Sequence, residues 1–339
     1  MRQKTTIFLS LMLILAVLLS GCSLGGTSTP AAPEATDTPT SAPVPTPTSV
    51  TPLAVLVIPT DLDQDTSNLY QKTVYDLAQQ AGYRFQVLNS LTPADLDPGL
   101  KVAIVLPPDP GIKELAAAAP QAQFLAVNIP GAQPGGNVSV LAQNTRIDVT
   151  AFLAGYMAAL TTDDYRTGII IPRDDQDGQN AYTAFTNGQQ YYCGVCNPTT
   201  PPWESYPLVQ DIPSDAKSSE YGAYADILIR HRVFTIFVYP SLATADLIDY
   251  LGTAGILVIG TKTPDKQWSN WIATIQPDII QAIQTAWPDL AAGNGGKTVN
   301  SPLTLADVNS DLLTPGKQRL AQQVLDDLLS GKISTGVNP

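Results

Sequence analysis

A pair of cysteines at close spacing is the first feature of this sequence that could support chemistry. Cys193 and Cys196 form a Cys-x-x-Cys pattern, which occurs in zinc sites and in thioredoxin-type redox motifs. A zinc site needs two more ligands, and the single histidine and distant third cysteine do not supply them. A redox pair should open a helix, but the Pro- and Thr-rich stretch 197–202 follows. Outside the cytoplasm, this pattern favours a structural disulfide.

The single histidine, His231, limits the catalytic mechanisms open to the chain. Ser-His-Asp and Cys-His catalysis would both have to use it. It lies in Arg230-His231-Arg232, at the end of an expected helix, where a cation stabilises the helix dipole. We therefore expect a capping role for His231 and no enzymatic activity. A hydrolase is the least supported of the three functions considered for this chain.

Spaced aspartates near the start of the folded part resemble a calcium loop. Asp61-x-Asp63-x-Asp65 has the right beginning, but Thr66 stands where the loop needs glycine and Lys72 where it needs the final glutamate. Without these two residues the loop can neither turn sharply nor close around the ion. We expect no metal and no cofactor.

The first 22 residues have the features of an export signal. Two cations among residues 1–4 precede an apolar run over 7–19, which is shorter than the roughly 20 residues that span a bilayer. The run ends in Leu-Ser-Gly-Cys at Cys22, which resembles the lipobox of bacterial lipoproteins. We expect residues 1–21 to be a signal peptide and Cys22 to carry lipid, which would place the protein on the extracytoplasmic face of the cell membrane. An uncleaved anchor helix and an ordinary secretory signal are the alternatives.

Composition separates a linker from the folded part. Residues 22–52 are dominated by Pro, Thr, Ser and Ala, which bury too little surface to fold, so we expect a disordered, semi-stiff stalk. Loss of Arg2 and Lys4 with the signal lowers the basic residues from 18 to 16 against 30 acidic ones, a net charge of −14. Such a charge repels nucleic acid and anionic lipid, so we expect no nucleic-acid partner and membrane contact through the lipid anchor only. The folded part contains no second apolar run long enough for a membrane span, and we expect it to be soluble.

Apolar runs and helical spacings in the folded part alternate in two similar series. The first series has strands expected at 53–58, 85–88, 102–106 and 124–127, with helices over 69–81 and 112–119. The second has strands at 167–171, 206–209, 233–238 and 256–259, with helices over 147–160, 181–191, 221–232 and 242–254. This alternation predicts two α/β lobes, each a doubly wound parallel sheet flanked by helices.

The remaining segments are too few for a third domain. We expect 272–275, 279–290 and 317–329 to cross back and complete the two lobes. The expected division is residues 53–143 plus about 264–300 for lobe 1, and 144–263 plus about 301–339 for lobe 2.

Motifs in the second series resemble a known family. Ala154-Gly155-Tyr156-Met157-Ala158-Ala159 precedes a strand containing Gly168, and Phe185-Thr186-Asn187-Gly188 follows it. Residues 256–260 and 329–333 add a Val-x-Val-Ile-Gly-like strand and an Ile-x-Ser-Gly-x-Ile-like ending. Together they resemble the basic membrane protein family of bacterial substrate-binding lipoproteins, which includes purine-nucleoside binders of ABC importers. The small residues also have a packing role: they let a helix lie close to the sheet, and Gly168 and Gly188 allow close approach of backbones.

The resemblance implies a two-lobed periplasmic-binding-protein type I fold and a role in transport. On this view the protein binds a small molecule, nucleoside-like or another small polar ligand, and delivers it to an ABC permease. The alternative is a lipid-anchored sensor or scaffold protein that retains the fold without transport.

The expected ligand site departs from the family pattern at three positions. Asn68 replaces a stacking ring that Tyr70 could supply, Asn128 replaces an aspartate, and Lys262 replaces a carboxylate. An ammonium in the last place favours an anionic or carbonyl-bearing ligand over a nucleoside. Trp268 is either a stacking platform or hinge packing. Since ligands of such folds bind at the carboxyl ends of strands, the cleft candidates are Asp61, Asp65, Ser67, Asp109, Asn128, Asp174, Tyr239, Lys262 and Trp268.

Overall fold

A computed structural model describes residues 50–142 and 146–337. The expected signal peptide, the lipidation site Cys22 and nearly all of the expected linker lie outside these residues. Within the described ranges, no helix combines the length and the apolar character that crossing a membrane requires.

The first of two sheets belongs to lobe 1 and is wholly parallel. Its strand order over the described residues is β11-β5-β4-β3-β1-β2. The continuous apolar character of β1, β3 and β4 suits strands that are buried on both faces. The strands are β1 Leu53–Val57, β2 Arg84–Leu88, β3 Leu100–Val105, β4 Gln123–Val127, β5 Val138–Ala142 and β11 Thr298–Asn300.

The second sheet belongs to lobe 2 and carries one antiparallel edge. Its order over the described residues is β12-β10-β9-β8-β6-β7, and β12 runs antiparallel to β10, with Thr274 paired to Ala306. The other pairs are parallel. The strands are β6 Thr167–Pro172, β7 Leu208–Ile212, β8 Thr235–Val238, β9 Leu257–Gly260, β10 Trp271–Pro277 and β12 Leu303–Ala306.

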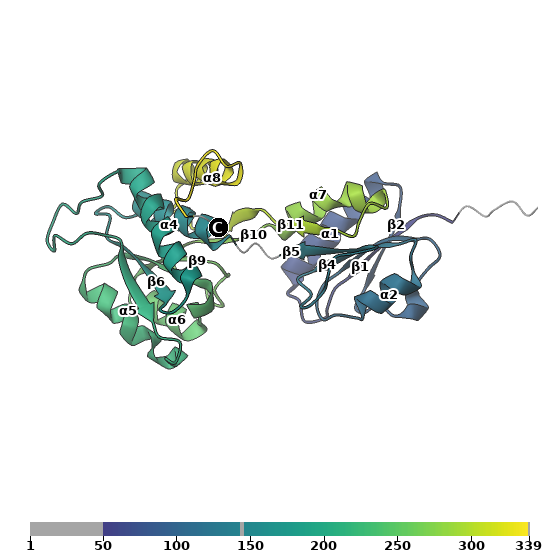
Figure 1. The fold of residues 1–339 in the computed structure, drawn as a ribbon, viewed down its shortest axis with the longest axis horizontal. Helices are drawn as coiled ribbons and strands as arrows, with labels where there is room; N and C mark the ends of the chain where they lie inside the picture. Colours follow the sequence, from purple (N-terminus) through teal and green to yellow (C-terminus); the bar gives the residue numbers. More distant parts are fainter. Residues whose placement is uncertain (1–49, 143–145, 338–339) are drawn as a thin grey trace, which may run out of the picture. The chain divides into compact units, whose positions relative to one another are not determined.

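Helices cover both faces of each sheet (Figure 1). On the first sheet, α1 and α7 bury their apolar sides in one core cluster, and α2 contributes to another on the opposite face. On the second sheet, α3, α4 and α8 share one cluster, and α5 and α6 share the other. The helices are α1 Gln64–Gln80, α2 Ile112–Ala118, α3 Ile147–Thr161, α4 Gln176–Cys193, α5 Tyr221–Arg230, α6 Ala245–Thr253, α7 Ile279–Ala291 and α8 Pro315–Leu329.

The structure has three strands that the sequence did not predict, namely β5, β11 and β12. The edge strand β11 is a three-residue segment, Thr-Val-Asn, with exposed ends, so it carries no hydrophobic pattern of its own. It forms by pairing with β5, about 160 residues earlier in the chain. Such strands are determined by distant pairing and cannot be found from local composition.

The expected lobe boundary near residue 264 is wrong. Strand β10 pairs with β9 and with β12 in the second sheet, so residues up to Pro277 belong to lobe 2. The chain then passes to lobe 1 at α7, whose Ile283 and Trp287 lie in a core cluster of the first sheet. It returns between β11 and β12. Strand β10 extends the sheet beyond β9, and this neighbour relation is not visible in the order of elements along the chain.

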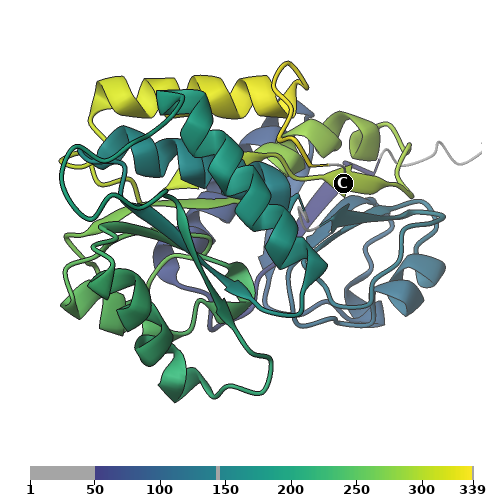
Figure 2. The same ribbon diagram turned by 60° about the vertical axis from the view of Figure 1, so that its left-hand side comes forward.

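Helices α3 and α4 cross at two glycines. A Cβ on Gly155 of α3 would lie 2.0 Å from the carbonyl oxygen of Phe185, and a Cβ on Gly188 of α4 would lie 1.9 Å from that of Phe152. The small residues of α3 therefore admit a neighbouring helix as well as the sheet. Figure 2 shows α8, in yellow, beside these teal helices, and α8 packs on α3. Because neighbours cover it on all sides, α3 is buried at almost every position and has no polar face.

The helix crossing predicts the effect of adding one methyl group. Gly155→Ala should lower the free energy of unfolding by about 1–3 kcal/mol or more, because the new Cβ overlaps a backbone carbonyl that cannot rotate away. The matched control is Gly316→Ala in α8, where nothing lies within 4 Å and alanine should add about 0.4–1 kcal/mol. Urea unfolding measures both. Equal effects of the two substitutions would contradict the close crossing.

Candidate functional site

A pocket of about 730 Å³ lies at the carboxyl ends of strands from both sheets. Asn128 follows β4, Tyr239 follows β8 and Thr261 follows β9, so the strands deliver these residues to one edge. We call it the carboxyl-edge pocket. It is lined by Thr66, Tyr70, Asn128, Ile147, Thr150, Asp177, Tyr239, Pro240, Ser241, Thr261, Lys262, Thr263, Ile275, Gln276, Pro277, Ile279 and Leu303.

Lobe 1 contributes a buried tyrosine to this pocket. Tyr70 lies on α1, which begins after Asp63 accepts a hydrogen bond of 2.9 Å from the backbone N–H of Thr66. Only 7% of Tyr70 is exposed, and burial raises the pKa of its hydroxyl to about 12. No hydrogen bond found among residues 50–142 and 146–337 involves that hydroxyl. Tyr70 is therefore a protonated group with a hydrogen bond still to give.

Asn128 adopts an unusual backbone conformation beside it. Its φ is 53°, in the left-handed region that asparagine tolerates better than most residues. The residue directly follows β4 and turns the chain away from the sheet. This conformation keeps the amide side chain, half-buried, at the wall of the pocket.

Lobe 2 places a second tyrosine beside two carboxylates. Burial, followed by a hydrogen bond and the charge of Asp175 and then the charge of Asp177, raises the pKa of Tyr239 to about 12. Asp175 is held in place because it caps α4, accepting a 3.0 Å hydrogen bond from the backbone N–H of Asp177. Tyr239 therefore stays protonated over the whole physiological range, and its hydroxyl can donate a hydrogen bond to a carboxylate.

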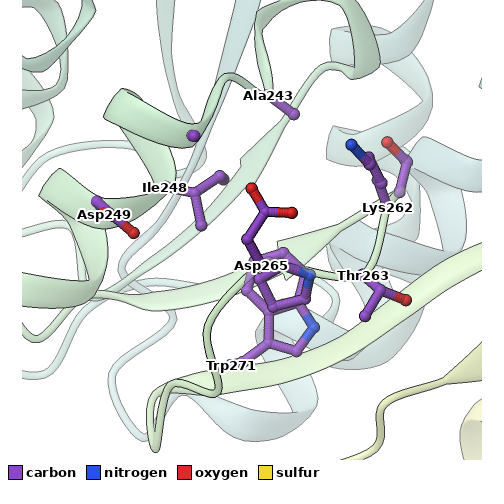
Figure 3. Close-up of a pocket in the computed structure, with 10 residues that line it drawn as sticks. Ala243, Ile248, Asp249, Lys262, Thr263, Asp265 and Trp271 are labelled. Carbon is purple, nitrogen blue, oxygen red and sulfur yellow. The ribbon is translucent and has the colours of Figure 1, made fainter. Parts of the chain in front are cut away.

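The loop after β9 carries Lys262, and aromatic packing at the end of this strand holds the loop in place. A Cβ on Gly260 would lie 2.2 Å from the ring of Trp271, so only glycine fits at the end of this strand. Figure 3 shows a smaller hollow here, in which Asp265 projects between Ile248 of α6 and Lys262.

A chain of hydrogen bonds also connects the same loop to β10. The indole N–H of Trp271 donates to Thr274 over 3.1 Å, and the Thr274 hydroxyl donates to Asp307 over 2.6 Å. Asp307 also accepts a 2.7 Å hydrogen bond from Thr263. One carboxylate just beyond β12 thus ties β10 to the loop that presents Lys262.

Three of the nine cleft candidates line the carboxyl-edge pocket: Asn128, Tyr239 and Lys262. Their part in binding remains a prediction. Asp109 has a local structural role instead. It caps α2 by accepting hydrogen bonds from the backbone N–H groups of Gly111 and Ile112, at 3.0 and 2.9 Å.

The other candidates also lie outside the lining. Ser67 faces along α1 and accepts a 3.0 Å hydrogen bond from Gln71. Asp61, Asp65 and Asp174 are exposed. Trp268 packs against Gly252, whose added Cβ would lie 2.5 Å from the indole, and Lys266 lies over its ring. The packing interpretation of Trp268 therefore fits its surroundings better than a stacking platform.

Several lining residues were not selected from the sequence. Thr150 and Asp177 lie in the first turns of α3 and α4, and Gln276 lies near the end of β10. A search restricted to the loops after strands misses first-turn helix positions. The signal that could have found Asp177 is its place in the first turn of the helix after β6, two residues beyond the cap Asp175.

The cysteines and the histidine lie elsewhere. A disulfide joins Cys193 to Cys196 at the end of α4. His231 ends α5 through its backbone N–H, while its ring contacts Glu204 at 2.7 Å. The capping thus comes from the main chain, and the side chain holds the neighbouring loop. Across the residues described, no group of three or more His, Cys, Asp or Glu side chains could hold a metal ion.

Comparison with known proteins identifies the fold family at low sequence identity. No protein-family model matches the chain, and no curated protein does. An ABC transporter system solute-binding protein from Conexibacter woesei DSM 14684 is 14% identical, with a TM-score of 0.50 over 84% of this chain and 98% of that one. A transcriptional activator of the comK gene from Bacillus halodurans is 13% identical, with a TM-score of 0.49 over 85% of this chain and 99% of that one. A solute-binding protein of an ABC transporter system from Aeropyrum pernix K1 is 15% identical, with a TM-score of 0.46 over 86% of this chain and 94% of that one. The chain has the type I periplasmic-binding-protein-like α/β fold.

The buried Tyr70 predicts a specific loss of stability at high pH. Because its pKa rises from 10 to about 12 on folding, Tyr70 favours the folded state below pH 10, and this contribution is lost as the pH rises towards 12. Tyr70→Phe should therefore remove on the order of 2–3 kcal/mol of the alkaline decline in unfolding free energy. Urea unfolding at pH 7 to 11.5 measures it. Tyr75→Phe, on the exposed side of the same helix, is the control and should keep the wild-type slope.

Proposed function

We propose that this protein is an extracytoplasmic solute-binding lipoprotein that delivers a small molecule to an ABC importer. The observation that carries the proposal is the carboxyl-edge pocket, where both lobes present polar side chains. Its size suits a small molecule, since ligand pockets commonly measure about 300–1,000 Å³. The residues that line it bind and orient; no step of bond chemistry is part of the proposal.

The path of the chain supports a binding function of this kind. It passes from β10 to α7 and returns from β11 to β12, so short segments near 278 and 301 connect the two lobes. Such connections can act as hinges when lobes close on a ligand. In the proposed cycle, ligand enters the pocket, the lobes close, and the closed form docks on the permease.

Two further parts of the proposal come from the sequence. The Leu-Ser-Gly-Cys22 ending of the apolar run supports a lipid anchor on the outer face of the cell membrane. The motifs around Gly155 and Gly188 support membership of the basic membrane protein family. The Conexibacter woesei protein, whose described role is solute binding for an ABC transporter, supports the transport role through its shared fold.

Ligand binding is tested with protein unfolded and refolded to remove carried-over ligand. We expect one class among nucleosides, sugars, amino acids and small organic acids to raise the melting temperature. At a hundred times the Kd, binding adds about 2.7 kcal/mol to the free energy of unfolding. Titration calorimetry then gives the affinity. A flat thermal and calorimetric response to every class would contradict the solute-binding function.

Anchoring is tested by labelling growing cells with an alkyne analogue of palmitate. Wild-type protein should carry the label and sediment with membranes, because two acyl chains hold a protein stably where one is marginal. Cys22→Ser should lose both properties. Cys193→Ser removes a cysteine from the folded part and should keep the label. Labelling of the Cys22→Ser variant would show that the anchor lies elsewhere.

A lipid-anchored sensor or scaffold protein without transport is the second candidate. It is motivated by the departures at Asn68, Asn128 and Lys262 from the family pattern. In the structure, Asn68 is exposed and accepts a 2.9 Å hydrogen bond from Gln64, so it supplies no stacking surface. Permease and ATPase genes beside the gene for this protein would favour transport; their absence would favour the sensor.

A further inference from the structure

Two exposed side chains of opposite charge line the carboxyl-edge pocket. Lys262, on the loop after β9, and Asp177, in the first turn of α4, both line it. None of the ion pairs formed within residues 50–142 and 146–337 includes either side chain. They are the only charged residues in the described lining, one of each sign. A pocket with such a lining presents one ammonium and one carboxylate to whatever enters it.

The order of the strands explains why these charges do not neutralise each other. Lys262 follows β9 and Asp177 follows β6, and β8 lies between these strands in the sheet. Neighbouring strands lie about 4.8 Å apart, so β9 and β6 are separated by about 10 Å. Tyr239 follows β8 and occupies the intermediate position, with its hydroxyl on the side of Asp175 and Asp177. The strand order thus places a lysine and an aspartate on either side of a tyrosine at one edge of the sheet.

Water solvates both exposed charges in this structure, so a ligand must satisfy both when the proposed closure of the lobes displaces that water. Removing water from an unpaired ammonium or carboxylate is costly, unless an opposite charge replaces the lost hydration. A neutral ligand such as a nucleoside replaces neither, and a ligand with one charge replaces only one. The rest of the lining is uncharged, with hydroxyl, amide and aliphatic groups. The buried Tyr70 adds an unused hydroxyl donor from lobe 1, which calls for an acceptor on the ligand.

We propose that the pocket takes a small zwitterion of the amino-acid type. Its carboxylate pairs with Lys262, its ammonium pairs with Asp177, and its hydrocarbon part lies against Tyr239 and the aliphatic side chains of the lining. This inference rests on the solute-binding function proposed above and names its ligand class. It also replaces the expectation of a merely anionic or carbonyl-bearing ligand, since Asp177 opposes a second negative group.

The first experiment compares ligand-free protein with pools of defined charge. The pools are the standard α-amino acids, straight-chain ω-amino acids of four to six carbons, monocarboxylates and dicarboxylates, mono- and diamines, and nucleosides with neutral sugars. Thermal shift ranks the pools, and calorimetry on single compounds follows. We expect a zwitterion pool to rank first, and the two zwitterion pools distinguish adjacent from separated charges.

The second experiment removes one charge at a time from the protein. Lys262→Gln and Asp177→Asn should each weaken the best zwitterion by about 10-fold or more, as expected for charge-assisted hydrogen bonds. Lys262→Gln should also weaken the analogue that lacks the amine, whereas Asp177→Asn should leave that analogue unchanged or bind it more tightly. The controls are Lys266→Gln, whose ammonium pairs with Asp249, and Asp174→Asn, which lies outside the lining. Both should bind like the wild type.

The outcomes separate this inference from the proposed function. Tightest binding of a nucleoside, a neutral sugar or a singly charged compound would overturn the zwitterion and keep the solute-binding function. Equal binding of the zwitterion by Asp177→Asn and Asp174→Asn would likewise overturn the zwitterion alone. The absence of a thermal shift and of calorimetric binding with every pool would overturn both proposals. A zwitterion whose affinity falls in both pocket variants and in neither control would support both.

Discussion

The contact between the backbones of α3 and α4 is the constraint on which lobe 2 depends. At Gly155 and Gly188 each helix lies against a carbonyl of the other, at a distance that leaves no room for a Cβ. This close approach lets α3 lie between the sheet, α4 and α8, and it explains why α3 is apolar on every side. Because α4 is positioned by the crossing, its first turn, with Asp175 and Asp177, is positioned as well. The geometry of the pocket is therefore set partly by two glycines that do not line it.

The end of the chain fixes α3 from its other side. Asp148 is 5% exposed and accepts hydrogen bonds from Arg146 at 2.8 Å and from Thr335 at 2.9 Å. Burial alone would raise the pKa of the Asp148 carboxyl, but these hydrogen bonds outweigh it and lower that pKa. Thr335 is in turn held through its carbonyl by Asn187 of α4, at 2.8 Å. The segment after α8 thus links the two crossing helices to each other.

Sequence reasoning found the fold because the buried strands carry their own signal. The apolar runs of β1, β3, β4 and β6 are continuous, and the alternation with helices predicts two doubly wound sheets. It missed β11 and β12, whose residues form strands only because distant partners exist, and it placed the lobe boundary too early for the same reason. In the site, the residues directly after strands were within reach, as Asn128, Tyr239 and Lys262 show. The sequence offers Tyr70 only as a residue that could supply the missing ring, since its burial and its unused hydroxyl depend on packing that no local pattern encodes.

The last sixty residues contribute elements to both lobes, and this affects the order in which the lobes can fold. Lobe 1 needs α7 and β11 to close its sheet, and lobe 2 needs β12 and α8. Neither lobe is complete in any fragment that stops before residue 300, although both begin far upstream. During synthesis from the N-terminus, both sheets therefore stay incomplete until residues 298–306 have been made. Lobe 1 gains its last strand, β11, at Asn300, whereas lobe 2 still needs β12 and α8, so a chain cut after residue 300 lacks elements of lobe 2 alone.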